Sequence, residues 1–512
     1  MQEKPIVIIG SGIAGLSAAL TLAAQQRQVI VIEGSETPGG KIRTLNVNGD
    51  IIDSGPTVLT MRSVFDEILE DAGFSLDDIA PTTPLICLAR HAWSETERLD
   101  LFADRQRSFD AIGEFAGLKE AEAYRAFSQA AEYTYNTLEH SFMRASKPNL
   151  ISLSWRVRSK GPLALMRTRP YSSLWQVLGE YFRDPRLIQL FARYATYCGC
   201  SPWQAPANLM LIAHLEQQGV WWVRGGMQRL AAGLMRAARQ RDVGFQFGRN
   251  VTDIATCRGR VSAVTLDNGE TIDCDSIICT ADPAAIHQGL LGRIAARSIV
   301  RRRQRQRSLS AITWSMTGVT RGFNLTHHNI FFSKDYALEF EQLFKQQSVP
   351  TQPTVYLCAQ DQAEDQSALG SPQRLLCVIN APAIGDRHTF NRQEIASCTK
   401  RIMNLLGSCN LQIATSPEQM QITTPSDFAR RFPGTAGALY GEATHGWRSA
   451  FHRPSARTSI PGLYLAGGGV HPGPGVPMVA LSGRLAARTL LQDWASIRPS
   501  ALVDTAGGIS TR

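Results

Sequence analysis

The sequence predicts an α/β fold in which a Rossmann-like dinucleotide-binding domain is interleaved with a second domain of α+β type. Three observations predict this arrangement. A strand, a glycine-rich turn and a helix follow one another within residues 6–33. A second block of strands and turns spans residues 220–282, and a third strand with a glycine turn begins near residue 461. Because long segments separate these blocks, we expect the nucleotide-binding domain to be assembled from three parts of the chain.

The first block contains the residues that a βαβ dinucleotide-binding unit requires. The aliphatic strand 6–9 is followed by a G-x-G-x-x-G turn, and a second strand, 29–32, ends in Glu33. Gly10 permits the tight turn, Gly12 lets the backbone approach a pyrophosphate, and Gly15 lets the helix pack closely on the strand. Glu33 can accept hydrogen bonds from a ribose 2′-OH, which disfavours NADP. The alternative is an apolar helix with chance glycines, since residues 5–26 carry no charge and would also satisfy a hydropathy window.

The charge of the chain is concentrated in two windows. The 512 residues include 53 Lys and Arg against 44 Asp and Glu, a net charge of +9. Residues 140–179 and 283–334 contain no acidic residue and together carry 16 of the basic ones, so the rest of the chain is acidic. A basic protein can bind nucleic acid, anionic lipid or an acidic substrate. We expect no nucleic-acid partner, because the sequence has no recognised nucleic-acid-binding motif.

Cysteine usage and the N-terminus indicate a reduced, cytoplasmic protein. Ten scattered Cys in 512 residues are too few for a disulfide scaffold. Residues 1–5 lead directly into the first apolar run, so we expect no signal peptide. Cys198 and Cys200 form a C-x-C, but neither a C-x-x-C pair nor a histidine at zinc-ligand spacing accompanies them. The sequence therefore predicts no metal site.

Three further motifs bear on the choice between FAD and NAD, which share the first fingerprint. After Glu33 the chain reads Thr37-Pro38-Gly39-Gly40-Lys41-Ile42-Arg43 and then Asp53-Ser54-Gly55-Pro56-Thr57. Near the C-terminus, residues 461–469 read as a strand and then a glycine turn that includes Gly467-Gly468-Gly469. The chain continues as Val470-His471-Pro472-Gly473-Pro474-Gly475-Val476-Pro477 and a helix. Glycines at 39 and 40 would let the backbone approach two phosphates, which Lys41 and Arg43 could face as cations. A helix that begins after Gly475 could stabilise negative charge on a reduced flavin.

These motifs resemble those of the amine oxidase and phytoene desaturase superfamily of FAD enzymes, and the chain is similar over nearly its whole length to phytoene-desaturase-type carotenoid oxidoreductases. His327-His328-Asn329-Ile330-Phe331-Phe332, Tyr440-Gly441 and Trp447-Arg448 add to the resemblance. Within that family, Gly55-Pro56-Thr57-Val58-Leu59-Thr60-Met61-Arg62 looks most like the hydroxyneurosporene (methoxyneurosporene) desaturase branch, the 1-hydroxycarotenoid 3,4-desaturases. The resemblance implies an amine-oxidase-like flavoprotein fold with FAD as cofactor.

The resemblance and the βαβ motif together predict the residues that contact FAD. In the family, the glycine-lysine loop lies near the phosphates, the Asp-x-Gly loop lies near the flavin, and the backbone of the residue that matches Val251 contacts the adenine. The predicted cofactor-binding residues are Gly10, Gly12, Ala14, Gly15, Glu33, Gly40, Lys41, Arg43, Gly55, Pro56, Thr57, Val251, Gly468, Gly469, Gly475, Val476 and Pro477.

The same elements predict the domain boundaries. We expect the FAD-binding domain to comprise residues 1–80, 220–290 and 425–495. Residues 81–219 and 291–424 would form the substrate and membrane-contact domain. Residues 243–281 read as a single meander with hairpin turns at Arg258-Gly259 and Asn268-Gly269. The small, polar residues 496–512 are expected to be a disordered tail.

The predicted reaction is FAD-dependent desaturation, which introduces a C-3,4 double bond into acyclic 1-hydroxy or 1-methoxy carotenoids. Desaturation removes a hydride and a proton from a CH–CH unit, so it needs a flavin and a proton acceptor but no nucleophile. His471, beside the predicted flavin loop, is the candidate base, and a turn residue is the alternative. Alternative functions are phytoene or neurosporene desaturation, carotenoid isomerisation, and a non-catalytic flavin-binding protein of pigment assembly. The electron acceptor would be oxygen or a quinone.

The first basic window predicts contact with a membrane. A carotenoid is insoluble in water, so it must reach the enzyme from a bilayer. Residues 140–179 place cations beside large apolar side chains such as Trp155, Leu163, Met166 and Tyr171, a composition typical of interfacial segments on anionic lipid. We therefore expect a cytoplasmic protein peripherally associated with the inner or photosynthetic membrane. The arginine-rich run at 297–307 could add attraction, and a solvated helix face is its alternative interpretation.

Overall fold

A five-stranded parallel sheet forms the centre of the nucleotide-binding part. The computed structural model describes residues 4–497 except 147–149, 158–162, 300–305 and 364–370. The strand order is β20 (Leu463–Leu465), β13 (Ser276–Cys279), β1 (Ile6–Ile9), β2 (Val29–Glu33) and β9 (Gly244–Phe247). All four strand pairs are parallel. Every residue of β1 is buried, because both faces of the sheet are covered by other elements of the chain. The predicted Rossmann-like domain is confirmed.

Three helices pack together on this sheet. They are α1 (Ile13–Ala23), α11 (Met227–Arg239) and α17 (Val476–Ile497), and their apolar side chains belong to one buried cluster with β1 and β2. All eleven residues of α1 are buried, which explains its uninterrupted apolar sequence. Gly15 is required in α1, since a Cβ at this position would lie 1.9 Å from the carbonyl oxygen of Gly10. The close contact of helix and strand that the motif predicts is therefore present.

A separate antiparallel meander lies beside this sheet. It consists of β10 (Val251–Cys257), β11 (Arg260–Leu266) and β12 (Thr271–Asp273), with turns at Arg258-Gly259 and Asn268-Gly269 as predicted. The expectation of a single meander over 243–281 is wrong at both ends. Strands β9 and β13 instead pair with β2 and β1 in the parallel sheet. Every residue of β13 is buried there, whereas β9 is a partly exposed edge strand.

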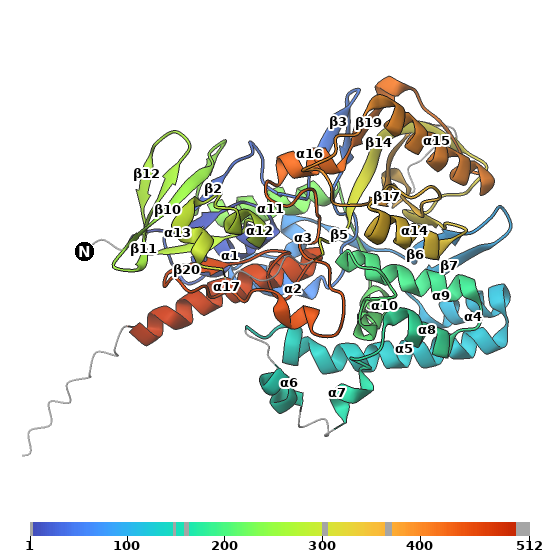
Figure 1. Ribbon diagram of the computed structural model, residues 1–512, viewed down its shortest axis with the longest axis horizontal. Coiled ribbons are helices and arrows are strands. Elements are labelled where there is room, and N and C mark those ends of the chain that lie inside the picture. The colour runs from blue at the N-terminus through green and yellow to red at the C-terminus, as the bar shows by residue number, and fades with distance from the viewer. Residues whose placement is uncertain (1–3, 147–149, 158–162, 300–305, 364–370, 498–512) are drawn as a thin grey trace, which may run out of the picture.

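A second, larger sheet forms the centre of the other domain. Its order is β18 (Gln412–Ala414), β14 (Ser310–Arg321), β17 (Gln373–Ala381), β16 (Val355–Ala359), β15 (His328–Phe331), β6 (Cys87–Ala92) and β7 (Arg98–Phe102), and β19 (Met420–Thr423) also pairs with β14. Strands β6 and β7 come from the first insert of the chain, and the others come from the second. The interleaved α+β domain predicted from the sequence is thus observed (Figure 1).

Helices cover this sheet through two apolar clusters. Residues of α15 (Arg392–Ser408) pack with β14, β16 and β17 in one cluster. The other cluster joins β6, β7 and residues after β15 to a helical layer. This layer consists of α4 (Arg105–Ala116), α5 (Leu118–Leu138), α8 (Leu174–Tyr181), α9 (Pro185–Ala192) and residues that precede α10 (Leu211–Gln217). Shorter helices connect the elements: α2 (Ser63–Asp71), α3 (Leu76–Ile79), α12 (Pro283–His287), α13 (Gly292–Arg297), α14 (Tyr336–Glu341) and α16 (Pro425–Arg431).

Two small ribbons and one helix connect the two parts. The ribbon β3 (Thr44–Val47) with β4 (Asp50–Asp53) contacts β14 and β17 of the large sheet. The ribbon β5 (Thr82–Pro84) with β8 (Trp221–Val223) joins the chain after α3 to the segment before α11. Helix α16 packs on β14, although its residues were expected in the FAD-binding domain.

The first basic window forms a projection below α5. Its described helices are α6 (Leu150–Val157) and α7 (Ala164–Arg167), which lie at the lower edge of the molecule in Figure 1. Within the described residues, no helix combines the length and apolarity that crossing a bilayer requires. Helix α17 runs to Ile497, and the remainder of the predicted tail, 498–512, lies outside the described residues, as do Lys147, Arg158, Lys160 and residues 301–305 of the basic windows.

Candidate functional site

The glycine turn after β1 is joined to the acidic end of β2. One carboxylate oxygen of Glu33 accepts hydrogen bonds from the backbone N–H of Ser11 at 2.6 Å and from its hydroxyl at 2.8 Å. The other oxygen accepts a bond of 2.9 Å from the N–H of Ser35. Gly12 forms a parallel bridge with Gly39, and the N–H of Gly39 donates to the carbonyl of Ser11 at 3.0 Å. The predicted phosphate turn, ribose-binding acid and second glycine motif therefore lie side by side.

This arrangement fits a bound dinucleotide. The chain brings a carboxylate, glycine backbone and the start of α1 to the carboxyl end of a parallel sheet, which is where nucleotides bind in open α/β folds. Ala14 lies buried in the first turn of α1. Val251 is buried at the start of β10, where it pairs with Leu266.

The two predicted phosphate-facing cations both contact the segment 423–439. Lys41 is partly buried and its Nζ donates to the carbonyl of Leu439 at 2.5 Å. Burial lowers the pKa of Lys41, against the attraction of Asp282. Arg43 is buried, and its Nη2 donates to Oγ1 of Thr423 at 3.2 Å. Burial lowers the pKa of Arg43 to about 10.

The Asp-x-Gly loop is fixed by a hydrogen bond to the start of α11. Oδ2 of Asp53 accepts a bond of 2.6 Å from the N–H of Met227. Gly226, which precedes Met227, has φ +89°, and a Cβ there would lie 2.4 Å from Oδ2 of Asp53. The amide of Gln360 bonds both backbone groups of Asp53, with its Oε1 accepting at 3.0 Å and its Nε2 donating at 2.8 Å. Gly55, Pro56 and Thr57 follow directly, so their position is set by these contacts.

Arg453 joins the C-terminal glycine loop to Tyr440, the neighbour of the Leu439 carbonyl that Lys41 contacts. Its Nη1 donates to the carbonyl of Gly468 at 2.9 Å and to that of Tyr440 at 3.3 Å. Gly469 lies beside Pro283, and Gly475 directly precedes α17, whose first two residues, Val476 and Pro477, are buried. The glycine motifs of the N- and C-terminal regions thus converge on one region of the molecule.

His471 is buried beside Phe142. Its Nε2 lies 3.0 Å from the carbonyl oxygen of Phe142, and the two rings are perpendicular with centroids 5.0 Å apart. A carbonyl can only accept, so Nε2 carries the proton. Burial lowers the pKa of His471 to about 4, and the ring is therefore neutral at pH 7.

A cavity of about 150 Å³ lies between the Asp-x-Gly loop, the start of α11 and the large sheet. The lining residues are Thr44, Ile51, Asp53, Thr57, Trp222, Val223, Gly225, Gly226, Met227, His327, Cys358, Gln360 and Arg374. His327 lines this cavity, whereas His471 does not. The lining combines predicted flavin-loop residues with side chains of β4, β16 and β17, so both domains contribute to it.

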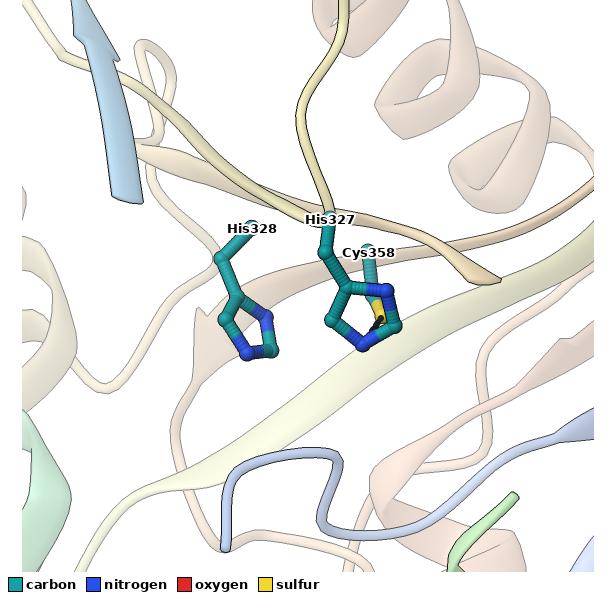
Figure 2. Close-up of side chains that lie close together, drawn as sticks. All are labelled: His327, His328 and Cys358. Atoms are coloured by element: carbon teal, nitrogen blue, oxygen red, sulfur yellow. Dashed lines mark hydrogen bonds between the residues drawn. The ribbon is translucent and has the colours of Figure 1, made fainter. Parts of the chain in front are cut away.

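A buried group of two histidines and a cysteine lies on the sheet side of this cavity. Figure 2 shows the imidazole of His327 against the thiol of Cys358, with the ring of His328 beside it. Nε2 of His327 lies 3.6 Å from Sγ of Cys358, and the two imidazole centroids are 4.5 Å apart. One nitrogen of each ring and Sγ all lie within 4.8 Å of one another, a set that could also hold a metal ion although the sequence predicts none. Burial lowers the pKa of His327 to about 4 and raises that of Cys358 to about 12.

His328 continues into a hydrogen-bonded chain that reaches the flavin loop. Its Nδ1 lies 2.7 Å from the hydroxyl of Tyr356, which lies 2.6 Å from Oγ1 of Thr57. Burial lowers the pKa of His328 well below its usual value and raises that of Tyr356 well above. All three groups are therefore neutral at pH 7.

Sequence reasoning identified Thr57 and the histidine pair but missed Tyr356, Cys358 and Gln360. These residues lie on or directly after β16, whose partner β15 begins at His328, and the antiparallel register places His328 opposite Cys358. Strand alternation then puts Tyr356 on the same face as Cys358. The only sequence signal is this two-residue spacing in a short apolar strand, which becomes informative once the pairing is known.

Comparison with known proteins places the chain in a family. Residues 13–491 match the family model described as flavin containing amine oxidoreductase. The hydroxyneurosporene desaturase of Rubrivivax gelatinosus is 48% identical, with 100% of this chain and 98% of the relative covered. The hydroxyneurosporene desaturase of Rhodobacter capsulatus is 41% identical over 96% of this chain and 98% of the relative. A 1-hydroxycarotenoid 3,4-desaturase of a Flavobacterium species is 30% identical over 94% of this chain and 98% of the relative.

A solved structure supports the fold independently of sequence. The cyclohexylamine oxidase of Brevibacterium oxydans superimposes with a TM-score of 0.55 at 16% identity, covering 96% of this chain and 100% of that one. The parallel sheet, the converging glycine motifs and the whole-length family match agree with one another. The chain belongs to the flavin containing amine oxidoreductase family and is an FAD-dependent oxidoreductase.

Proposed function

We propose that the protein is a carotenoid desaturase that introduces a C-3,4 double bond into acyclic 1-hydroxy or 1-methoxy carotenoids. The observation that carries the proposal is the 48% identity to a hydroxyneurosporene desaturase over the whole chain. A 1-hydroxycarotenoid 3,4-desaturase at 30% identity supports the same position of the new double bond. Amine oxidation is less well supported, because the solved amine oxidase shares only the fold.

FAD, when bound, supplies a hydride acceptor for the allylic C–H bond. The chain provides the surroundings that this chemistry requires. Trp222, Val223 and Met227 offer apolar contacts in the cavity, and they can orient a stiff polyene and exclude water. The predicted cofactor residues, from Gly10 to Pro477, would hold FAD at the converging glycine motifs.

The second product of desaturation is a proton, and we assign its acceptor to His327 in preference to His471. His327 lines the cavity, and its pKa of about 4 keeps it unprotonated at neutral pH. A base this weak is sufficient, because loss of the hydride leaves a polyene cation whose neighbouring C–H is strongly acidic. His471 bonds the carbonyl of Phe142 and fits a structural role.

Membrane contact through α6 and α7 is part of the proposal. Four of the nine exposed large apolar side chains among the described residues lie here: Trp155, Leu163, Met166 and Tyr171. Arg156 and Arg167 are exposed beside them. Other cations of the window are neutralised, since Arg144 pairs with Glu67 and Glu139 and Arg169 pairs with Glu180. Apolar side chains flanked by two exposed cations support insertion into an anionic membrane surface.

An assay with two substrates tests the proposed reaction. Purified holoenzyme would be given 1-hydroxyneurosporene or neurosporene in anionic liposomes, with oxygen or a quinone as the electron acceptor. The proposal predicts that the hydroxylated substrate gains one conjugated double bond, seen as a red shift of its absorption. Conversion of neurosporene alone would support the alternative desaturases. Isomers without new conjugation would indicate an isomerase, and bound FAD without any conversion would indicate a flavin-binding assembly protein.

A further inference from the structure

A chain of three neutral polar groups lies where a site for a hydrocarbon would be expected to be apolar. It runs from Oγ1 of Thr57 through the hydroxyl of Tyr356 to Nδ1 of His328. Thr57 lines the cavity between the domains, and His328 is 3% exposed at the other end. Burying polar groups costs free energy unless they are hydrogen-bonded. Thr57 makes one such bond here, and its hydroxyl can make another with a ligand in the cavity.

The positions of the protons in this hydrogen-bonded chain leave Thr57 able to form one more hydrogen bond with a ligand in the cavity. If the phenol of Tyr356 donates to Nδ1 of His328, then Thr57 donates to the phenol and presents lone pairs to the cavity. If Nδ1 donates instead, the phenol donates to Thr57, whose own proton is then free. Either arrangement is possible because Nε2 of His328 is buried without a hydrogen-bond partner among the described residues, so neither tautomer is excluded. The cavity end can thus accept or donate one hydrogen bond.

We propose that the Thr57 end of this chain binds the C-1 hydroxyl of the carotenoid end group and thereby selects hydroxylated over hydrocarbon substrates. The inference rests on the proposed function. C-1 is separated from C-3 by one carbon, so a substrate placed with C-3 and C-4 beside the flavin loop also places its hydroxyl beside that loop. Thr57 belongs to the loop and lines the cavity.

The two proton arrangements also account for a methoxy group. A hydroxyl can donate to Thr57 or accept from it, whereas a methyl ether can only accept. A change of tautomer at His328 reverses the direction of both hydrogen bonds, and Thr57 can then donate its proton to the ether oxygen.

The test uses Tyr356→Phe, which removes the middle hydroxyl and keeps the ring. Binding is measured on the oxidised holoenzyme in detergent by quenching of protein fluorescence. The first ligand is the 3,4-desaturated product, which keeps the hydroxyl and has already lost the hydrogens that this reaction removes. The second is neurosporene, which lacks the hydroxyl. We expect Tyr356→Phe to weaken binding of the hydroxylated ligand by roughly 10-fold and to leave neurosporene binding unchanged.

A matched control is Tyr124→Phe. Tyr124 is buried in the helical layer, where its hydroxyl donates to Oε1 of Gln217 at 2.7 Å, so this variant also loses a phenol hydrogen bond but away from the cavity. It should change neither dissociation constant. If Tyr356→Phe does not retain FAD, the pair Thr57→Ser and Thr57→Val replaces it, and only the valine variant should lose the preference for the hydroxyl.

Three results would overturn the inference. They are an equal loss of affinity for both ligands, no loss for either, or a stoichiometric metal ion that Cys358→Ser removes, since a cation would make the cluster a metal site. These outcomes are distinguishable from failure of the proposed function. If the wild-type enzyme desaturates 1-hydroxyneurosporene and one of these results is obtained, the proposed function stands and the hydroxyl-binding site is refuted.

Discussion

Asp53 and Met227 lie 174 residues apart in the sequence and are joined by a hydrogen bond of 2.6 Å from the N–H of Met227 to Oδ2 of Asp53. The bond places a carboxylate at the N-terminus of α11, where a free N–H and the positive end of the helix dipole both favour it. It also fixes the loop that carries Thr57 to the helix layer of the nucleotide-binding part. The position of the cavity thus depends on a contact between two segments of the nucleotide-binding part that are far apart in the sequence.

Removing this carboxylate should loosen both the helix and the cavity. We expect Asp53→Ala to lower the free energy of unfolding by about 1–2 kcal/mol, the usual effect of losing a helix cap, and to lower FAD content. Asp53→Asn should retain most of the stability, because its amide oxygen can still accept from Met227 and it carries no buried charge. Urea unfolding and the flavin-to-protein absorbance ratio measure the two effects. Equal losses in both variants would show that the charge, and not the hydrogen bond, holds the loop.

Glu33 should contribute to FAD affinity chiefly through the adenosine ribose. Glu33→Gln replaces a carboxylate that already accepts bonds from Ser11 and Ser35 with a neutral amide. A charged hydrogen bond is worth about 1.5–3 kcal/mol, so we expect the dissociation constant of FAD to rise by roughly 10- to 100-fold. FMN lacks the adenosine ribose, and its affinity is the control. An equal change for FAD and FMN would mean that the variant disturbs the fold of the turn.

Stability should fall in acid through His471. Its pKa is about 4 in the folded protein and 6.5 in the unfolded chain, so the unfolded state binds a proton that the folded state excludes. The stabilisation is complete above pH 6.5 and is lost as the pH falls toward 4, by at most about 1.4 kcal/mol per pH unit. His471→Asn should reduce the dependence of the unfolding midpoint on pH and leave the part that His327 and His328 contribute. His140→Asn, at a side chain that is 81% exposed, should leave that dependence unchanged.

The same histidine provides a functional comparison with His327. His327→Gln should slow flavin reduction by substrate without changing the affinity for the desaturated product, because the acceptor of the proton is lost. His471→Asn should leave the rate of flavin reduction at neutral pH near that of the wild type. The reverse pattern, measured by stopped-flow absorbance, would return the role of base to His471.

Membrane binding should depend on Leu163 and not on exposed leucine in general. Leu163 beside α7 is 67% exposed, and Leu118 at the start of α5 is 69% exposed, so they form a matched pair. We expect Leu163→Glu to lower sedimentation with anionic liposomes several-fold and Leu118→Glu to have no effect. Wild-type binding should also weaken with added salt, since the exposed cations contribute. Equal binding by both variants would exclude α6 and α7 as the contact.

The nucleotide-binding part was predictable because local chemistry dictates it. Gly15 must be glycine where α1 crosses Gly10, and Glu33 must end β2 for its carboxylate to reach Ser11. These residues lie close together in the sequence, so what each must do is visible as a local motif. The error at β9 and β13 has the opposite cause, since a short apolar strand reads the same whether it joins a meander or a parallel sheet.

The cavity could not be predicted because it is made by pairing across long sequence separations. Thr57 and Tyr356 are 299 residues apart, and Asp53 and Gln360 are 307 apart. Nothing local marks Tyr356 or Cys358 as site residues until the register of β15 with β16 is known. Charge patterning was informative only in part, because Arg144 and Arg307 of the acid-free windows pair with acids from elsewhere in the chain.

Anaerobic flavin reduction tests the central claim most directly. Holoenzyme would be mixed with 1-hydroxyneurosporene in liposomes without oxygen or quinone, and the visible absorbance of the flavin would be followed. The account predicts that the flavin bleaches in one turnover while one 3,4 double bond forms per flavin, and that neurosporene bleaches it far more slowly. A flavin that stays oxidised with the hydroxylated substrate, or that neurosporene reduces equally fast, would contradict the account.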